Sequence, residues 1–419
     1  MNFFTFLIIS SIFVIYLLGV TSNLLNLKNI SNVIPLEFEG YFDKEKYAKA
    51  QNYVKHNINF NMFYSTSILI LQVTFILAGG FNYVNSLAVS FKCGTVITGL
   101  IFLSILYLIY EIIELFSSSY LTFVIEESFG FNKMNFRTFI TDFIKSFAIN
   151  GIILGIIFSA AVWIFSSIEH YAWLYAFAAI TLFELFIAFI YPTAVMPLFN
   201  KYTPLEDGTL KKSIEEYALK ENFKMQGLFK MDNSRRSTKS NAFFTGFGRF
   251  RRIVLFDTLI QNHTVEELTS ILAHEMGHFK LGHMLKQIFF SIGSTGITLF
   301  ILSLSINGYW LYKAFLMDSY PTYAGIILFT FVYAPIQFII SIIANYFSRK
   351  HEYEADAYAV TTYNHPQDMI NALKKLSVNN LSNLYPHKFK VFLEYSHPPI
   401  LDRIRAIRNI SEKRNGKTT

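Results

Sequence analysis

Seven long apolar runs constrain the fold of this chain more than any other feature of its sequence. A helix needs about 20 consecutive apolar residues to cross the hydrocarbon core of a bilayer, which is about 30 Å thick. Buried helices of a soluble protein rarely supply seven such runs in one chain, so we predict a polytopic membrane protein of mostly α-helical class. Five runs precede a central polar region and two follow it: Phe3–Val20, Met62–Gly80, Thr95–Phe116, Ala148–Ile168, Tyr171–Tyr191, Ile288–Ile306 and Tyr323–Tyr346.

The composition agrees with this prediction. Hydrophobic residues make up 53% of the 419 residues and charged residues only 16%, against about 25% charged residues in an average soluble domain. The first apolar run has no positive charge before it and no small-residue cleavage site after it, so we expect a retained span and not a signal peptide. The single cysteine, Cys93, excludes an intrachain disulfide framework and a cysteine-based zinc site.

The distribution of basic residues predicts the orientation of the spans. The net charge is +7, but the lysines and arginines gather in particular loops, so we expect no nucleic-acid partner. The loops after the first four spans hold five, one, three and no Lys or Arg residues in turn, while the central polar region holds 14 and the tail 12. Because basic loops stay on the cytosolic side, we predict that the N-terminus lies outside and that both polar regions are cytosolic.

Residues 21–59 form a polar stretch between the first two spans. Within it, the spacing of Tyr47, Ala50 and Tyr53 places three apolar side chains on one helical face. We therefore predict a short amphipathic helix after the first span.

The central region carries signals for β-structure. Apolar and alternating residues predict two strands, Asn241–Phe250 and Ile253–Leu259, joined by Arg251 and Arg252. A strand at the edge of a sheet can offer its backbone groups to an extended peptide. An ordinary hairpin explains the same spacing equally well.

The sequence His274-Glu275-Met276-Gly277-His278 is an HExxH motif. On a helix, His274 and His278 lie on one face, so both imidazoles can reach one ion. Glu275 lies beside that ion and can take a proton from a metal-bound water. Thr264 and Glu267 form a capping-box pattern that predicts the start of this helix. The motif therefore predicts a zinc site, against the alternative of two incidental histidines.

A catalytic zinc site takes three protein ligands and one water. An extended HExxHxxGxxH motif would supply a third histidine, but Leu281 and Met284 stand at the required positions. His283 is one residue short, which favours a surface residue or a partner of a ligand over a ligand.

An acidic residue on a second helix can complete the ligand set. The stretch after the last span offers Glu352, Glu354 and Asp356. Glu352 and Asp356 are four residues apart and share a helical face, whereas Glu354 points elsewhere. Glu352 as a ligand, with Asp356 accepting a hydrogen bond from a ligand imidazole, would complete the site. An ordinary charged helix next to the membrane is the alternative.

These motifs, taken together and in order, resemble those of the integral-membrane type I CAAX prenyl endopeptidases, a family of zinc proteases with seven spans. The resemblance covers nearly the whole chain. It is carried by Phe123–Lys133, Pro197–Leu205, Ser240–Gly246, the HExxH motif, Ser348–Ala357 and Ser396–Pro399.

The resemblance implies one zinc ion bound by His274, His278 and Glu352, with Glu275 as the general base. Asp356 matches the acidic residue of the family's ExxxD motif, which serves as a proton donor or as a hydrogen-bonding partner of a ligand. The implied cofactor is therefore a single Zn²⁺.

Further residues take roles from the same resemblance. His397 matches a histidine close to the zinc that is suited to stabilising an oxyanion. Asn241 and Ala242 match an edge strand that pairs with the substrate backbone. The implied fold is a barrel of seven transmembrane helices around a water-filled chamber, with a cytosolic zinc-protease domain that contains a small β element.

The chain then divides into four parts. Spans 1–5 occupy residues 1–200, and a cytosolic protease segment with the edge strand and the HExxH helix follows at 201–286. Spans 6 and 7 occupy 287–347, and a C-terminal cytosolic segment with the ExxxD helix and the His-Pro-Pro motif occupies 348–419.

The expected function is zinc-dependent hydrolysis of peptide bonds near the C-terminus of CAAX-type, prenylated substrates. The expected partners are a peptide or lipidated peptide and membrane lipids. A quality-control metalloprotease that does not require prenylation is one alternative. A non-catalytic channel or transporter with a vestigial zinc site is another, although it would have no use for Glu275.

The last residues of the sequence help to predict which cellular membrane contains the protein. The tail Lys417–Thr419 shows no dilysine retrieval signal. This favours a bacterial inner membrane, with the endoplasmic reticulum membrane as the alternative.

Overall fold

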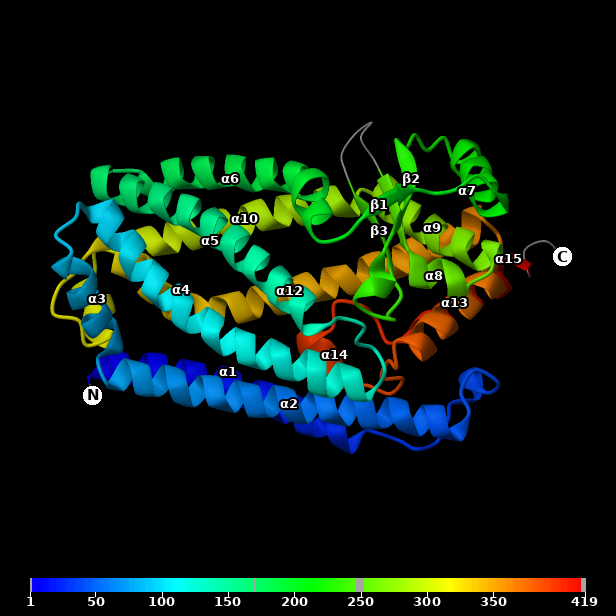
Figure 1. The fold of residues 1–419 in the computed structure, drawn as a ribbon, viewed down its shortest axis with the longest axis horizontal. Helices are drawn as coiled ribbons and strands as arrows, with labels where there is room; N and C mark the ends of the chain where they lie inside the picture. The colour runs from blue at the N-terminus through cyan, green and yellow to red at the C-terminus, as the bar shows by residue number, and fades with distance from the viewer. Residues whose placement is uncertain (1, 169, 246–251, 416–419) are drawn as a thin grey trace.

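The structure, a computed structural model, describes residues 2–168, 170–245 and 252–415. Seven helices among the described residues are long and apolar enough to cross a membrane, which confirms the seven predicted spans. They run along the long axis of the molecule (Figure 1). These helices are α1 Phe3–Lys28, α2 Lys44–Leu77, α4 Thr95–Tyr120, α5 Phe136–Ser167, α6 Ala172–Ile190, α10 His283–Ser305 and α12 Thr322–Thr362.

The seven spans close into a ring. α4 packs on α5, α5 on α6, and α6 on α10. The ring continues from α10 to α12 and from α12 to α1, which packs on α2. The short helix α3 (Gly80–Ser90) contacts both α2 and α4 and completes the circuit. The predicted helical barrel is therefore confirmed.

Polar side chains line a cavity of about 540 Å³ between α10 and α12. Near it, Glu184 of α6 accepts a hydrogen bond of 3.0 Å from Thr295 of α10, so this carboxylate within a span faces protein and not lipid. The polar lining residues are Gln287, Ser291, Ser294, Thr295, Thr298, Gln337, Ser341 and Asn345.

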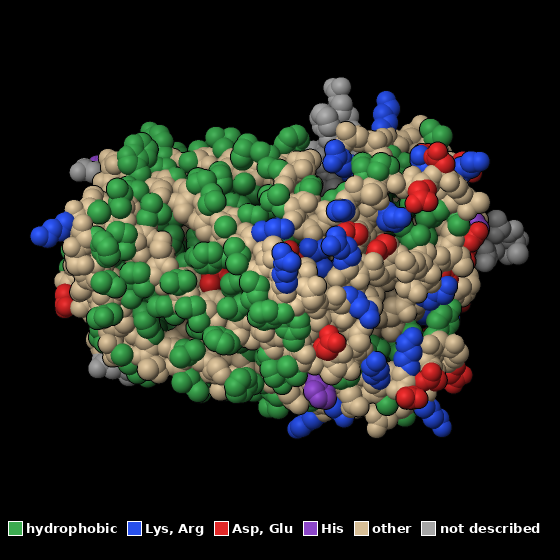
Figure 2. Space-filling view, viewed as in Figure 1, with side chains coloured by type: hydrophobic (Ala, Val, Ile, Leu, Met, Phe, Trp, Pro, Cys, Tyr) green, Lys and Arg blue, Asp and Glu red, His purple; other side chains and the backbone are tan. Residues whose placement is uncertain are grey.

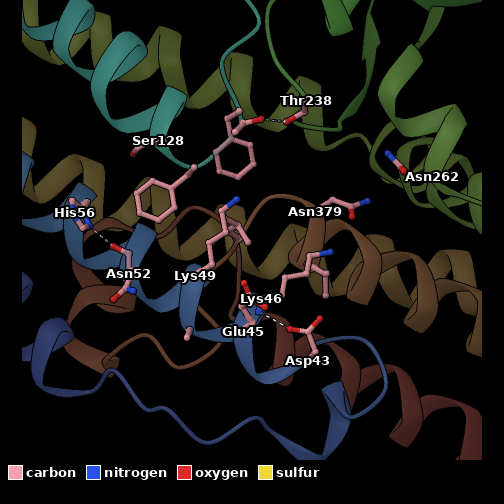
Figure 3. A pocket seen from close by; sticks show the side chains of 16 residues that line it. Asp43, Glu45, Lys46, Lys49, Asn52, His56, Ser128, Thr238, Asn262 and Asn379 are labelled. Carbon is pink, nitrogen blue, oxygen red and sulfur yellow. Dashed lines mark hydrogen bonds between the residues drawn. The ribbon is translucent and has the colours of Figure 1, made fainter.

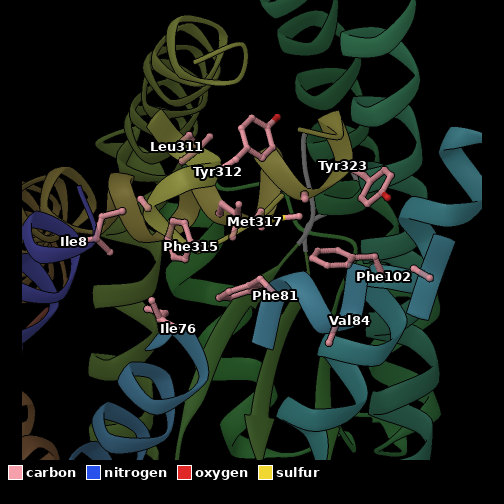
Figure 4. Packing of buried hydrophobic residues seen from close by; sticks show 14 of the residues in the cluster. Ile8, Ile76, Phe81, Val84, Phe102, Leu311, Tyr312, Phe315, Met317 and Tyr323 are labelled. Atoms are coloured by element: carbon pink, nitrogen blue, oxygen red, sulfur yellow. The ribbon is translucent and has the colours of Figure 1, made fainter. Parts of the chain in front are cut away.

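The end of the bundle away from the sheet is closed by two short helices that the sequence analysis did not predict, α3 and α11 (Tyr309–Ala314). Large buried side chains from both helices and from the neighbouring spans pack there in one cluster (Figure 4). Phe81, Phe102 and Phe315, for example, are each less than 5% exposed. This apolar core fixes one end of the ring.

The short amphipathic helix predicted around Tyr47 is not a separate element. It forms the first turns of α2, which continues without a break to Leu77. Asp43 caps this helix by accepting a hydrogen bond from the backbone N–H of Lys46. Residues 44–77 contain no glycine or proline to end it, so the polar turns and the apolar span form one helix.

The polar end of the molecule contains a four-stranded sheet with strand order β1-β2-β4-β3. β2 and β4 are parallel, and the outer pairs are antiparallel. The predicted small β element is therefore present, with β3 at one edge. The strands are β1 Tyr202–Pro204, β2 Gly227–Met231, β3 Ala242–Thr245 and β4 Arg252–Phe256.

Two details of the predicted strands are wrong. Arg252 belongs to β4 and not to the connection, and β4 ends at Phe256. The next residues form a helix, α8 (Asp257–Asn262), because the Asp257 carboxylate at its first position favours the helix N-terminus. Residues 246–251, with Arg251, lie outside the described part of the chain.

Further helices lie at the polar end of the molecule, beside the sheet and the ends of the spans. Charged side chains gather over this end of the molecule, whereas the surface of the bundle is mostly hydrophobic (Figure 2). The helices are α7 Thr209–Lys220, α9 Val265–Lys280, α13 Pro366–Asn379, α14 Lys388–Glu394 and α15 Ile400–Asn415, with short 3₁₀ or π segments at Leu36–Phe38, Leu121–Glu126, Tyr191–Val195, Met196–Leu198 and Asn233–Arg235.

Candidate metal centre and active site

Helix α9 carries the HExxH motif, and its start is fixed as the sequence predicts. The Thr264 side chain accepts from the backbone of Glu267 at 3.3 Å, and the Glu267 carboxylate accepts from the backbone of Thr264 at 2.9 Å. The apolar face of α9, with Leu268 and Leu272, packs into the core beneath the sheet.

A close helix crossing brings the two predicted halves of the site together. α9 packs along the polar end of α12, and Gly277 of the HExxH motif lies at the crossing. A Cβ atom on Gly277 would lie 3.2 Å from both the Cα and the carbonyl oxygen of Ala355. The absence of a side chain at Gly277 therefore sets the distance between the two helices.

His274, His278 and Glu352 meet at this crossing, where their ligand atoms lie close enough together that they could hold one metal ion; we call them the metal-ligand trio. The Nε2 atoms of His274 and His278 are 3.1 Å apart. Glu352 Oε1 lies 3.3 Å from His278 Nε2, and Glu352 Oε2 lies 3.6 Å from His274 Nε2. Tetrahedral zinc with bonds of about 2.0–2.1 Å holds its ligands about 3.3 Å apart. The trio therefore fits such an ion, with a fourth position left for water or substrate.

Asp356 lies directly behind the trio. Its Oδ1 atom is 2.9 Å from Nδ1 of His274, and the residue is only 1% exposed. Contact with a carboxylate fixes the ring orientation of a metal-binding histidine, since the opposite nitrogen then faces the ion. Asp356 therefore lies where a supporting partner of a ligand histidine is expected.

Arg403 is a site residue that the sequence analysis missed. Its guanidinium contacts the carboxylates of Glu352 and Asp356, with Nη1 lying 3.0 Å from Glu352 Oε2. Burial lowers the pKa of Arg403, but the neighbouring Asp356 raises it more, so the group stays charged. The sequence does contain a pattern that indicates a buried Arg403, because Ile400, Arg403 and Ile407 share one face of an amphipathic helix. A buried arginine among apolar positions requires acidic partners.

Glu275 lies on α9 one position round from the first histidine and is partly buried. Burial raises the pKa of its carboxyl above the ordinary value of 4.5, while His274 and His278 lower it. A raised pKa brings a carboxyl closer to the range in which a general base both holds and releases a proton efficiently.

His397 reaches the trio from the loop between α14 and α15. Its Nδ1 atom lies 3.1 Å from Glu352 Oε1, yet 67% of the side chain is exposed. The imidazole therefore reaches Glu352 from the solvent side.

The predicted substrate-binding residues lie at the edge of the sheet. Ala242 begins β3 and pairs with Leu255 of β4. Asn241 precedes the strand, and its carbonyl accepts from the backbone of Phe256 at 3.1 Å. β3 has one sheet neighbour among the described strands and packs beside α9. Among the described strands β3 is thus an edge strand, close to the HExxH helix.

A separate pocket of about 900 Å³ lies beside the first turns of α2 (Figure 3). Lys46, Lys49, Asn52, Phe129 and Asn379 are among its lining residues. No residue of the metal-ligand trio lines it, so this pocket lies apart from the candidate metal centre.

Two family descriptions match adjoining parts of the chain. Residues 23–201 match the description "CAAX prenyl protease N-terminal, five membrane helices". Residues 204–411 match "Peptidase family M48".

Individual relatives match over most of their length. The chain is 35% identical to the probable CAAX prenyl protease 1 of Schizosaccharomyces pombe, over 90% of this chain and 82% of that protein. It is 31% identical to the human CAAX prenyl protease 1 homolog, over 90% and 89%. The crystal structure of S. mikatae Ste24p superposes with a TM-score of 0.91 at 31% identity, covering 97% of this chain and 99% of that one.

The helical membrane ring and the HExxH centre define a multi-pass membrane metalloendopeptidase. Within that class, the chain belongs to the M48 peptidase family, in the group with the CAAX prenyl protease N-terminal region. The resemblance read from the sequence is confirmed. The alternative of a non-catalytic channel or transporter is set aside.

Proposed function

We propose that this protein is a zinc-dependent endopeptidase that cleaves CAAX-type, prenylated substrates near their C-terminus at the cytosolic face of a membrane. The observation that carries the proposal is the trio of His274, His278 and Glu352, whose facing atoms lie 3.1–3.6 Å apart. The names of the relatives from fission yeast and human support the CAAX substrate class.

The trio would hold the zinc ion. When bound, zinc lowers the pKa of a water towards about 7 and polarises the substrate carbonyl. The side chains behind the trio hold it in position. Asp356 keeps the second nitrogen of the His274 ring engaged, so that Nε2 faces the ion, and Arg403 holds both Asp356 and Glu352.

Two further side chains act on the reacting peptide. Glu275 takes a proton from the attacking water and passes it to the leaving amine, a role worth about 10²–10⁴-fold in rate. His397, exposed above Glu352, donates a hydrogen bond to the oxyanion that forms on the scissile carbonyl.

The substrate backbone adds to the free edge of β3. Ala242 lies along this edge, where its N–H donates to the side-chain oxygen of Asn241 at 2.9 Å, so a bound peptide would compete with Asn241 for that donor. Strand addition uses main-chain hydrogen bonds and so tolerates varied side chains. It presents an extended peptide alongside α9 and the trio.

The orientation and the host membrane are part of the same proposal. The basic residues of the polar regions favour a cytosolic site and an outside N-terminus. The bacterial inner membrane is the predicted location and the endoplasmic reticulum membrane the alternative. Protease protection of tagged termini in sealed vesicles tests the orientation.

The decisive experiment uses the full chain purified in detergent, with metal analysis and cleavage of a farnesylated CAAX-type peptide. We expect one zinc per chain and cleavage that a chelator abolishes. Glu275→Gln should keep the zinc and lose about 10²–10⁴-fold in turnover. Glu352→Ala should lose the zinc itself. Full zinc content in Glu352→Ala, or full turnover in Glu275→Gln, would refute the assigned roles.

The same assay with an unmodified twin peptide tests the substrate class. Preference for the farnesylated peptide supports a CAAX protease. Equal cleavage of both peptides would favour the quality-control protease that does not require prenylation.

A further inference from the structure

A second group of side chains lies directly behind His278. It contains His283, His351 and Glu354, from the first turn of α10 and the polar end of α12. His283 is only 1% exposed, so it is not the surface residue that its spacing allowed. Gly282, with a φ of +68°, turns the chain between α9 and α10 and brings His283 back against the HExxH helix.

The hydrogen bonds in this group form a chain. Nδ1 of His278 lies 3.0 Å from Nδ1 of His283. Nε2 of His283 lies 2.9 Å from Oε2 of Glu354. One histidine thus links the HExxH motif to a carboxylate 76 residues further along the sequence.

The positions of the protons in this chain follow from the trio. Nε2 of His278 faces His274 and Glu352, so it must be unprotonated to bind a metal. The ring proton of His278 is then on Nδ1, which donates to Nδ1 of His283. Nδ1 of His283 is therefore an acceptor, and its proton is on Nε2, which donates to Glu354. Every donor in the chain meets an acceptor.

We propose that His283 and Glu354 are positioning residues, which we call the His278 relay. The imidazole of His283 lies between His278 and Glu354, and through it the relay orients the second histidine ligand. The proposal rests on the metal site proposed above. It gives the two histidine ligands matching support, because His274 contacts Asp356 directly and His278 reaches Glu354 through His283. Such outer partners set the tautomer and direction of a ligand ring and thereby strengthen metal binding.

The same three side chains suggest a competing function, a second metal site. The rings of His283 and His351 are stacked, with centroids 4.1 Å apart and an angle of 12° between the planes. Nitrogen lone pairs lie in the ring plane, so two stacked rings direct them within separate, nearly parallel planes that do not meet at one ion. The stacking therefore favours the relay over a second ion.

The test is competition with a chelator for the zinc of the full-length protein in detergent. His283→Leu breaks the relay, and we expect about 10–100-fold weaker zinc binding. His283→Gln should restore most of the affinity, because its amide can accept from His278 and donate to Glu354. Glu354→Leu, at a partly exposed position, should weaken binding less than His283→Leu. His351→Phe keeps a ring stacked on His283 and leaves the relay intact, so it should bind zinc as the wild type does.

Several outcomes would overturn the relay. Wild-type affinity in both His283→Leu and Glu354→Leu would do so, as would equal losses in His283→Leu and His283→Gln. A content of two zinc ions per chain that falls to one in His283→Leu would make His283 a ligand. Glu352→Ala separates this proposal from the first: if that variant keeps its zinc, the metal site itself is wrong, whatever the relay variants show.

Discussion

Arg403 holds Asp356 through two hydrogen bonds, at 2.8 Å from Nε to Oδ2 and 2.6 Å from Nη2 to Oδ1. This pairing is buried, with Asp356 1% and Arg403 8% exposed. The remaining terminal nitrogen of the guanidinium contacts Glu352. One arginine from the C-terminal helix therefore fixes the two acidic residues that α12 contributes to the site.

We predict that Arg403→Met destabilises the protein strongly and weakens zinc binding. Removing one partner of a buried ion pair costs roughly 3–5 kcal/mol, because the remaining charge is left without compensation. Arg403→Lys should restore only part of the loss, since an ammonium cannot form the two-pronged contact. Thermal unfolding in detergent and zinc competition measure the two effects. Arg405→Met, at a side chain 72% exposed, is the matched control, and equal Tm values for both methionine variants would contradict the prediction.

We predict that Gly277→Ala impairs the metal centre without removing a ligand. The new methyl group would press on the backbone of Ala355, which cannot move aside as a flexible side chain can. Overpacking of this kind costs about 1–3 kcal/mol and would increase the separation of α9 and α12. Lower Tm and weaker zinc binding are expected. Gly293→Ala, where a Cβ meets no atom within 4 Å, should leave both values unchanged, and the same result for Gly277→Ala would disprove the role of the close crossing.

The apolar runs predict where the spans lie but not where the helices end. Each run shows the part of a helix that lipid requires, whereas the helix continues until a residue stops it. The first run ends at Val20, for example, but α1 continues to Lys28. The capping side chains Asn2, Asp43 and Asn135 mark true helix starts, and they are readable in the sequence once the helix is known.

Helical spacing predicts those parts of the candidate metal site that lie on a single helix. His274 and His278, like Glu352 and Asp356, are pairs four residues apart, and the structure places both pairs on one crossing. Arg403 could not be placed, because its pairing with Asp356 depends on how α15 packs against α12. Glu354 does leave the shared face of Glu352 and Asp356, as predicted. Its contact with a histidine of another helix is a tertiary feature that spacing does not reveal.

We predict that Asn380→Ala weakens substrate binding and leaves the zinc content unchanged. The Asn380 side chain accepts from the backbone N–H of Ser240 at 3.1 Å and donates to its carbonyl at 3.2 Å. These two bonds fix the chain just before β3. Each is worth about 0.5–1.5 kcal/mol, so KM for a farnesylated peptide should rise up to about tenfold. Asn379→Ala, which changes the amide one residue earlier in the chain, is the control. An unchanged KM in Asn380→Ala, with normal folding, would argue against substrate addition at β3.

The pH dependence of cleavage should report the buried position of Glu275. Burial raises the pKa of its carboxyl above 4.5, against the lowering effect of His274 and His278. A general base works only when it is charged, so activity is present above this raised pKa and is lost as the pH falls through it. The acid limb of kcat/KM should therefore have a midpoint above pH 4.5. Zinc content measured in the same samples separates this titration from loss of the metal at low pH. A midpoint at or below 4.5 with zinc fully retained would show that the positive charges at the site, the bound zinc included, outweigh the effect of burial on Glu275.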